Sequence, residues 1–264
     1  MKIYGLTDKG IIREANEDCI GITFLSGGPA VAVVCDGMGG AKGGRTASEL
    51  AERAFTNAIT PELFPLTLDG EKLPPDIKKV KRALSAAVAK ANEAVFTTAR
   101  EHQELRGMGC TLNAAVYYER EGKLCFANVG DSRLYMITEK EIKLLSKDHS
   151  YVQHLVDSGK ISPEEAESHP QKNLITRAVG IEPSVKADVS YIKVSTKKPA
   201  YFLLCSDGLH GLIPADEIKS TVLGAGSVED KVISLINGAN LAGGTDNISA
   251  ILLEINENQG GARK

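Results

Sequence analysis

Short apolar runs alternate with longer amphipathic segments along this chain, and the runs have the length and composition of β-strands. The first two runs, at 19–25 and 30–35, are separated by the turn-forming sequence Ser-Gly-Gly-Pro. We expect them to form an antiparallel hairpin. Further strands are expected at 110–118, 123–129, 133–137, 184–194, 200–206 and 249–255.

Other segments have the spacing of amphipathic helices. The longest, 76–102, repeats apolar residues at helical intervals, among them Val80, Leu84, Val88 and Val95. Strands joined by short turns favour antiparallel sheets, and helices of this kind must cover sheet faces, so the pattern predicts an α+β fold. Shorter helices are expected at 43–59 and 228–242, with a proline-containing loop at 61–75 and a polar stretch with helix fragments at 147–180.

Composition narrows the class of protein. We expect one domain over 1–257 and a frayed tail at 258–264, because the 264 residues contain no internal repeat or linker. A net charge of −3 gives no general electrostatic case for binding nucleic acid or membranes. The sequence shows no membrane-spanning or signal-peptide pattern, and five cysteines without CxxC spacing favour structural thiols, so a cytoplasmic protein is expected.

Four aspartates stand at the ends of predicted strands. Asp18 precedes one run of the hairpin and Asp36 follows the other, so antiparallel pairing would bring both to the same end of the sheet. Asp207 and Asp246 have the same relation to the last two strands. Aspartate is a common turn residue, but four converging carboxylates would repel one another unless cations were bound. The pattern therefore predicts a carboxylate cage for hard divalent cations.

An ordered series of motifs supports this interpretation: TDKGIIREANED (7–18), VVCDGMGG (33–40), MGCTLNAA (108–115), NVGDSRLY (128–135), KDHS (147–150), NLITRAVG (173–180), LLCSDGL (203–209) and GTDNIS (244–249). In this order the series resembles the metal-dependent protein phosphatases of the PP2C (PPM) family, in their compact bacterial form. The resemblance implies a four-layer αββα sandwich of two antiparallel sheets flanked by helices. It also implies hydrolysis of phosphoserine and phosphothreonine in proteins by a water bridging two Mn²⁺ or Mg²⁺ ions.

The same resemblance implies roles for individual residues. Arg13 would bind the substrate phosphate, because a planar guanidinium can donate hydrogen bonds to two phosphate oxygens at once. Phosphoproteins acted on by a serine/threonine kinase would be the substrates, a flap at about 148–180 would border the site, and the protein would be a monomer. The metal-holding residues would be Asp36 with the Gly37 carbonyl, Glu17 with Asp18, Asp207 with Asp246, and Asp131 at a weaker third metal.

The chain also departs from the family. No histidine follows the Asp36-Gly37 pair, where the family often has one, and Ala41 leaves the proton donor to the leaving group unassigned. His149, His210 and a metal-bound water all remain open for that role. A non-catalytic relative should have lost metal acids, which this chain keeps. An aspartyl-nucleophile phosphohydrolase would need an acid where Met38 stands.

Overall fold

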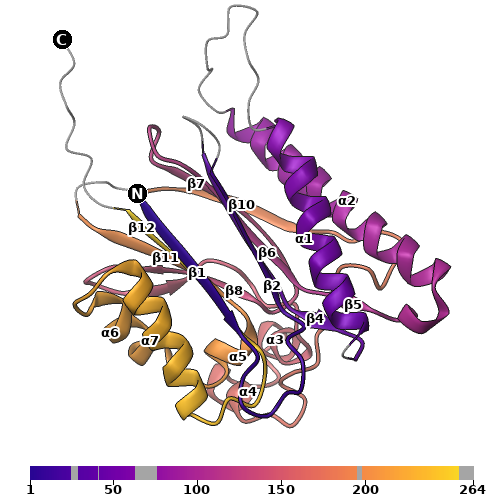
Figure 1. Ribbon diagram of the computed structural model, residues 1–264. Coiled ribbons are helices and arrows are strands. Elements are labelled where there is room, and N and C mark those ends of the chain that lie inside the picture. Colours follow the sequence, from indigo (N-terminus) through magenta and orange to yellow (C-terminus); the bar gives the residue numbers. More distant parts are fainter. Residues whose placement is uncertain (25–28, 41, 63–75, 195–197, 256–264) are drawn as a thin grey trace, which may run out of the picture.

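Two five-stranded antiparallel sheets pack face to face in the computed structural model, and helices cover both outer faces (Figure 1). The structure describes residues 1–24, 29–40, 42–62, 76–194 and 198–255, without the side chains of residues 61 and 62. The four-layer αββα arrangement expected from the sequence is confirmed.

The first sheet has the strand order β1-β12-β11-β8-β9, and the second has the order β10-β7-β6-β3-β2. A separate two-stranded ribbon pairs β4 with β5. All of these pairings are antiparallel, which agrees with the short connections read from the sequence. The strand bounds are β1 Lys2–Asp8, β2 Cys19–Phe24, β3 Ala30–Cys35, β4 Gly37–Met38, β5 Gly109–Cys110, β6 Leu112–Tyr118, β7 Lys123–Val129, β8 Arg133–Ile137, β9 Ile142–Leu144, β10 Asp188–Lys193, β11 Ala200–Cys205 and β12 Ile248–Ile255.

Two helices lie against the second sheet, α1 (Gly43–Glu62) and α2 (Ile77–Glu101), and they also pack on each other. On the opposite side of the molecule α6 (Ala215–Leu223) and α7 (Val228–Leu241) flank the first sheet (Figure 1). The remaining helices are short: a 3-10 turn at Gln103–Leu105, α3 (Tyr151–Asp157), α4 (Pro163–Glu167) and α5 (Asp207–His210). None of the described helices is long and apolar enough to cross a membrane.

The apolar core forms three layers, one at each interface of the sandwich. Phe55 and Leu84 fill the layer between the helix pair and the second sheet. Phe202 and Leu134 lie between the two sheets, and Leu235 packs under the first sheet. Strands β3 and β11 are buried on both faces, and their sequences are therefore continuous apolar runs such as AVAVVC.

Some elements differ from the sequence prediction. Strand β1 was not expected, and it lies half-buried at the edge of the first sheet beside β12. The strands expected at 110–118, 123–129 and 133–137 follow one another along the chain but do not share one sheet: β7 belongs to the second sheet and β8 to the first. Gly130, with φ of 99°, stands at this crossing, a backbone conformation that favours glycine. Helix α6 was also missed, and β10 begins at Asp188 rather than at 184.

Several predictions lie outside the described residues. They are the hairpin turn at 26–28, most of the loop at 61–75, the position of Ala41 and the tail at 258–264. The stretch expected to form a flap, 148–180, is described and contains α3 and α4. Ser162 and Glu165 form a reciprocal capping box at the start of α4, which explains why so short a helix begins there.

Leu84 tests the packing of α2 on the sheet. Its side chain is fully buried, so we expect Leu84→Ala to lower the free energy of unfolding by about 2 to 5 kcal/mol. Leu241→Ala is the matched control, because that leucine is 90% exposed and its truncation leaves no cavity. Denaturant unfolding measures both; equal stability of the two variants would contradict the packing described.

Candidate active site

The register of the strands brings the four aspartates to one end of the sandwich. Cys19 pairs with Cys35 in the hairpin, so Asp18 and Asp36 each stand one residue beyond the same end of the second sheet. In the first sheet Cys205 pairs with Ala250, and both Asp207 and Asp246 lie beyond that end. The arrangement expected from the sequence is therefore present. We call the six carboxylates gathered here the acidic rim: Glu17, Asp18, Asp36, Asp131, Asp207 and Asp246.

Asp18 joins the two sheets at the rim. Its Oδ2 accepts hydrogen bonds from Ser206 Oγ at 2.9 Å and from Ser249 Oγ at 2.6 Å; Ser249 lies in β12 of the first sheet, and Ser206 directly follows β11 of the same sheet. Its Oδ1 is buried and has no hydrogen-bond partner among the described residues. The Oδ2 atom therefore links the ends of the two sheets, and the Oδ1 atom is left available to another ligand.

Asp36 is held by its backbone. Its N–H donates to Thr111 Oγ1 at 2.9 Å, and the Thr111 N–H donates to the Asp36 carbonyl at 2.8 Å. The next residue must be glycine, because a Cβ on Gly37 would collide with the carbonyl oxygens of Glu17 and Gly44. These contacts fix the direction of the chain, so the carboxylate leaves the strand end in one defined position.

Arg13 lies beside the rim. Its Nη2 donates to Asp246 Oδ2 at 2.8 Å, and both side chains are partly exposed. The guanidinium therefore combines contact with the acids and access to solvent. An arginine placed this way can meet an anionic ligand that approaches the rim from outside.

Asn247 is a rim residue that the sequence analysis missed. Its Oδ1 accepts from the Glu17 N–H at 2.8 Å, and its Nδ2 donates to the carbonyls of Lys9 and Ala15, each at 2.9 Å. One amide side chain thus ties the loop between β1 and β2 to the start of β12. The signal was present in the motif GTDNIS, but no local pattern shows what a buried asparagine binds.

Asp131 and Asp207 face each other across the sheet crossing. Asp131 is buried in the turn between β7 and β8, and Asp207 opens α5 directly after β11. The Oδ1 atom of Asp207 is also buried and has no hydrogen-bond partner among the described residues. Two of the rim carboxylates, Asp18 and Asp207, thus keep an oxygen that the protein itself does not satisfy.

Burial and mutual repulsion raise the pKa values of the rim. Burial, followed by the charges of the neighbouring aspartates, raises the pKa of Asp36 well above its usual range. Burial is also the main cause that raises the pKa of Asp18 and that of Asp131, each to about 7. The pKa of Asp207 rises as well, through burial and then the charge of Asp246. In the protein alone, the ionised form of these carboxyl groups is therefore destabilised relative to the protonated form.

The donor set fits hard divalent cations. Carboxylate and carbonyl oxygens are their preferred ligands, and two buried carboxylate oxygens lack a partner within the described part of the chain. No three His, Cys, Asp or Glu side chains among the described residues converge tightly enough to enclose an ion by themselves. A cation here would therefore complete its coordination with carbonyl oxygens and retained water, as Mg²⁺ commonly does.

Both candidate histidines are engaged in structural contacts. His210 Nε2 lies 3.1 Å from the Asp131 carbonyl, and burial lowers its pKa to about 3, so the ring stays neutral. His149 Nδ1 accepts from the Gly130 N–H at 3.1 Å, and its Nε2 faces Arg177 and Asp188. Burial and the charge of Arg177 lower the pKa of His149 as well. Neither is poised as a charged proton donor.

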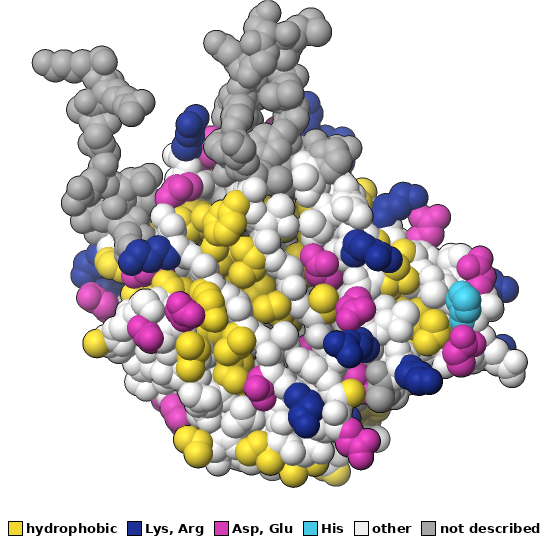
Figure 2. Space-filling view, viewed as in Figure 1, with side chains coloured by type: hydrophobic (Ala, Val, Ile, Leu, Met, Phe, Trp, Pro, Cys, Tyr) yellow, Lys and Arg dark blue, Asp and Glu magenta, His cyan; other side chains and the backbone are white. Residues whose placement is uncertain are grey.

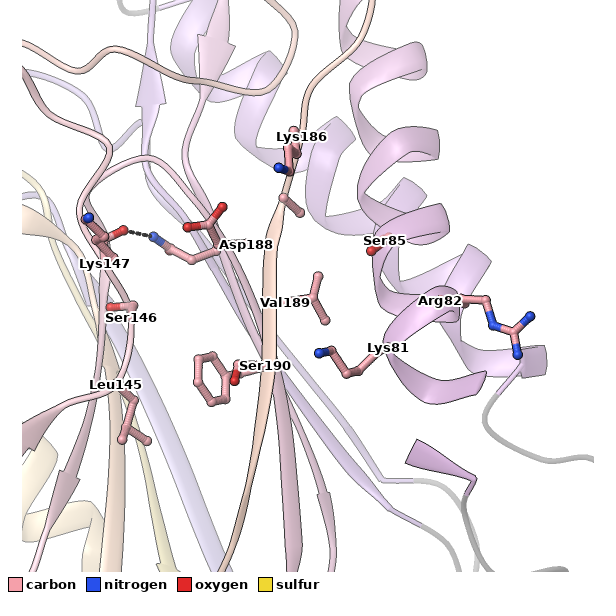
Figure 3. A pocket seen from close by; sticks show the side chains of 13 residues that line it. Lys81, Arg82, Ser85, Leu145, Ser146, Lys147, Lys186, Asp188, Val189 and Ser190 are labelled. Atoms are coloured by element: carbon pink, nitrogen blue, oxygen red, sulfur yellow. Dashed lines mark hydrogen bonds between the residues drawn. The ribbon is translucent and has the colours of Figure 1, made fainter. Parts of the chain in front are cut away.

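A surface groove of about 590 Å³ lies elsewhere, around the edge strand β10 (Figure 3). Lys81, Arg82 and Lys186 line it together with Asp188, which already contacts Arg177 and His149. None of the rim carboxylates belongs to its lining. The groove is therefore separate from the rim.

Comparison with known proteins agrees with this geometry. The profile of the family described as Protein phosphatase 2C matches residues 13–235. The serine/threonine phosphatase stp of Listeria welshimeri is 35% identical over 255 residues, covering 97% of this chain and 96% of that protein.

Solved structures show the same fold. The serine/threonine phosphatase Stp1 from Staphylococcus aureus superimposes with a TM-score of 0.82 at 34% identity, covering 95% of this chain and 93% of that chain. The catalytic domain of the serine threonine protein phosphatase PstP, in complex with two manganese ions, gives a TM-score of 0.78 at 29% identity, with 97% and 98% covered. By profile, sequence and fold alike, this chain belongs to the protein phosphatase 2C family.

Proposed function

We propose that this protein hydrolyses phosphoserine and phosphothreonine in proteins at a binuclear Mn²⁺ or Mg²⁺ centre held by the acidic rim. The observation that carries the proposal is the convergence of carboxylates from distant segments at one end of the sandwich, two of them with a buried oxygen that has no hydrogen-bond partner among the residues that the structure describes. The relatives named above are serine/threonine phosphatases, and the PstP structure holds two manganese ions.

The metal-holding roles follow from the family resemblance. Asp36 would contact both ions, and the Gly37 carbonyl would be a further ligand. Asp207 and Asp246 would hold one ion, and Glu17 and Asp18 the other, partly through water. Asp131, with Asp207, would support a weaker third ion. Bound there, two divalent cations would supply Lewis-acid charge and ready a water for attack on phosphorus.

The protein's own part in the reaction is positioning. Arg13 would bind two phosphate oxygens in a planar fork, and it would exchange part of its contact with Asp246 for the substrate. Thr111 and Asn247 would keep Asp36 and Glu17 in place through backbone contacts, so little reorganisation would accompany binding. Because both histidines are neutral and structurally bonded, water is the preferred proton donor to the leaving alkoxide.

Partners and location follow as predictions. Phosphoproteins that a serine/threonine kinase produces are the proposed substrates. The sequence predicts a cytoplasmic protein without nucleic-acid or membrane partners, and the family resemblance implies a monomer. A non-catalytic binding module is the rival function. The retention of every rim acid argues against it, since acids that repel one another cost stability unless they serve a metal.

Proton and metal binding should compete at the rim. A carboxyl group whose pKa is raised in the fold binds its proton more tightly there than in the unfolded chain. The contribution of this group to the free energy of unfolding is therefore most favourable below its unfolded pKa, at about 4. That contribution is lost as the pH rises through the folded pKa, which is about 7 for Asp18 and Asp131. A bound cation removes this loss, because it stabilises the charged form.

The metal-free protein should accordingly lose stability between about pH 4 and pH 7. We expect the melting temperature in chelator to fall across this range by about 2 °C or more, and Mn²⁺ to restore it most strongly at the high end. Asp18→Asn should flatten the fall, since the amide keeps an acceptor for Ser206 and Ser249 but carries no charge. A melting temperature that rises across the range in chelator would contradict the electrostatics described.

Loss of a rim carboxylate should abolish turnover without unfolding the protein. We expect Asp36→Asn and Asp207→Asn each to lower kcat/KM on a phosphothreonine peptide at least about a hundredfold, because charge stabilisation at the reacting phosphate is lost. Asp216→Asn, on the exposed surface of α6, is the control with the same chemical change. Initial rates are measured with and without added Mn²⁺. Metal-independent turnover, or full activity of both rim variants, would refute the proposal.

Arg13→Lys separates positive charge from planar geometry. Lysine keeps the charge but cannot form two parallel hydrogen bonds to a phosphate, so kcat/KM should fall about ten- to a hundredfold. Arg120→Lys, at an exposed site, should have no effect. The same peptide assay measures both. Unchanged kcat/KM in the Arg13 variant would show that this arginine does not bind the substrate phosphate.

A further inference from the structure

We infer that Ile11, Ile12 and Leu241 form an apolar contact surface for the residues beside the phosphoresidue of the substrate, so that phosphopeptides with apolar flanks are preferred. We call these three side chains the isoleucine patch. The inference rests on the proposed function, since it names the substrate class of the same site. It begins from exposure: Ile11 is 62% exposed, Ile12 is 66% exposed and Leu241 is 90% exposed.

The patch lies next to the rim. Ile12 directly precedes Arg13, whose guanidinium contacts Asp246. Leu241 ends α7, and Asn240 beside it donates to Asp8 Oδ1 at 3.1 Å, so the end of this helix is fixed to the end of β1. A Cβ built on Gly244 would meet both the Cγ1 atom of Ile11 and the Oδ1 atom of Asn240, so Ile11 lies close to the end of α7.

The loop that carries the isoleucines is held firmly. The N–H groups of Ile11 and Ile12 both donate to the Gly244 carbonyl, at 2.8 and 3.2 Å. Gly10 has φ of 77°, and a Cβ there would collide with the Asp246 carbonyl, so the backbone passes close to β12. The isoleucines are therefore exposed on a fixed backbone, and their β-branched side chains have few rotamers to lose on binding.

The geometry of an extended peptide then indicates which part of the substrate contacts the isoleucine patch. Successive residues of an extended chain advance about 3.3 Å, so the neighbours of a phosphoresidue bound at Arg13 must pass within a few ångströms of that position. Single exposed apolar residues are common on protein surfaces and need no explanation; apolar side chains are visible among the charged ones on the face shown in Figure 2. Here two consecutive ones adjoin the phosphate-binding arginine, and apolar residues of the substrate can cover them.

The test compares two phosphothreonine peptides of equal length and charge, one with leucine and valine flanking the phosphoresidue and one with serine and glycine. With Mn²⁺ present, we expect the wild-type protein to favour the apolar peptide about tenfold in kcat/KM, mainly through KM, since the contact is made equally before and during the reaction. The double variant Ile11→Ser/Ile12→Ser should reduce this preference to about one while still hydrolysing the polar peptide.

The control is Phe24→Ser. Phe24 is 64% exposed, but it ends β2 at the opposite end of the strand from Cys19 and the rim. This variant should keep the wild-type preference. Equal rates on both peptides by the wild type, or an unchanged preference in the double variant, would overturn the inference and leave the phosphatase proposal standing. Absence of metal-dependent turnover on either peptide would overturn the proposed function itself.

Discussion

The carboxylate of Asp18, which bridges the two sheets, is the contact on which the site depends. Asp18 directly precedes β2 of the second sheet, and it accepts hydrogen bonds from Ser249 in β12 and from Ser206 just after β11, both at the first sheet. An anion buried in this position is costly, and two hydroxyl donors offset only part of that cost. Its other oxygen has no partner among the described residues, which leaves it available to a proton, a water or a cation.

The other carboxylates of the acidic rim are likewise destabilised by burial and by the charges of their neighbours. Asp36 follows a strand of the second sheet and Asp207 a strand of the first, and after burial as the main cause the charge of Asp207 raises the pKa of Asp36 and that of Asp131. Such groups destabilise the metal-free fold, and three apolar layers must compensate for them. Functional sites commonly break the rules of stability that the remainder of a protein obeys.

The loop between β1 and β2 shows how positioning is achieved without regular structure. Asn247 holds its two ends through Lys9, Ala15 and Glu17, and Gly244 holds its middle. Arg13 and the two isoleucines therefore extend from a backbone that is hydrogen-bonded at several points beside the acids.

The sequence by itself determined the helices α2 and α7 and the hairpin of β2 and β3, because these follow from local periodicity and turn residues. It also placed Asp18 and Asp36 at one strand end, since antiparallel pairing leaves no other arrangement. Only the tertiary structure decided that β7 and β8 belong to different sheets, that β1 completes an edge, and that Asn247 and two serines support the rim. The physical reason is that sheet membership and buried polar pairing depend on contacts between distant residues, which leave no periodic trace along the chain.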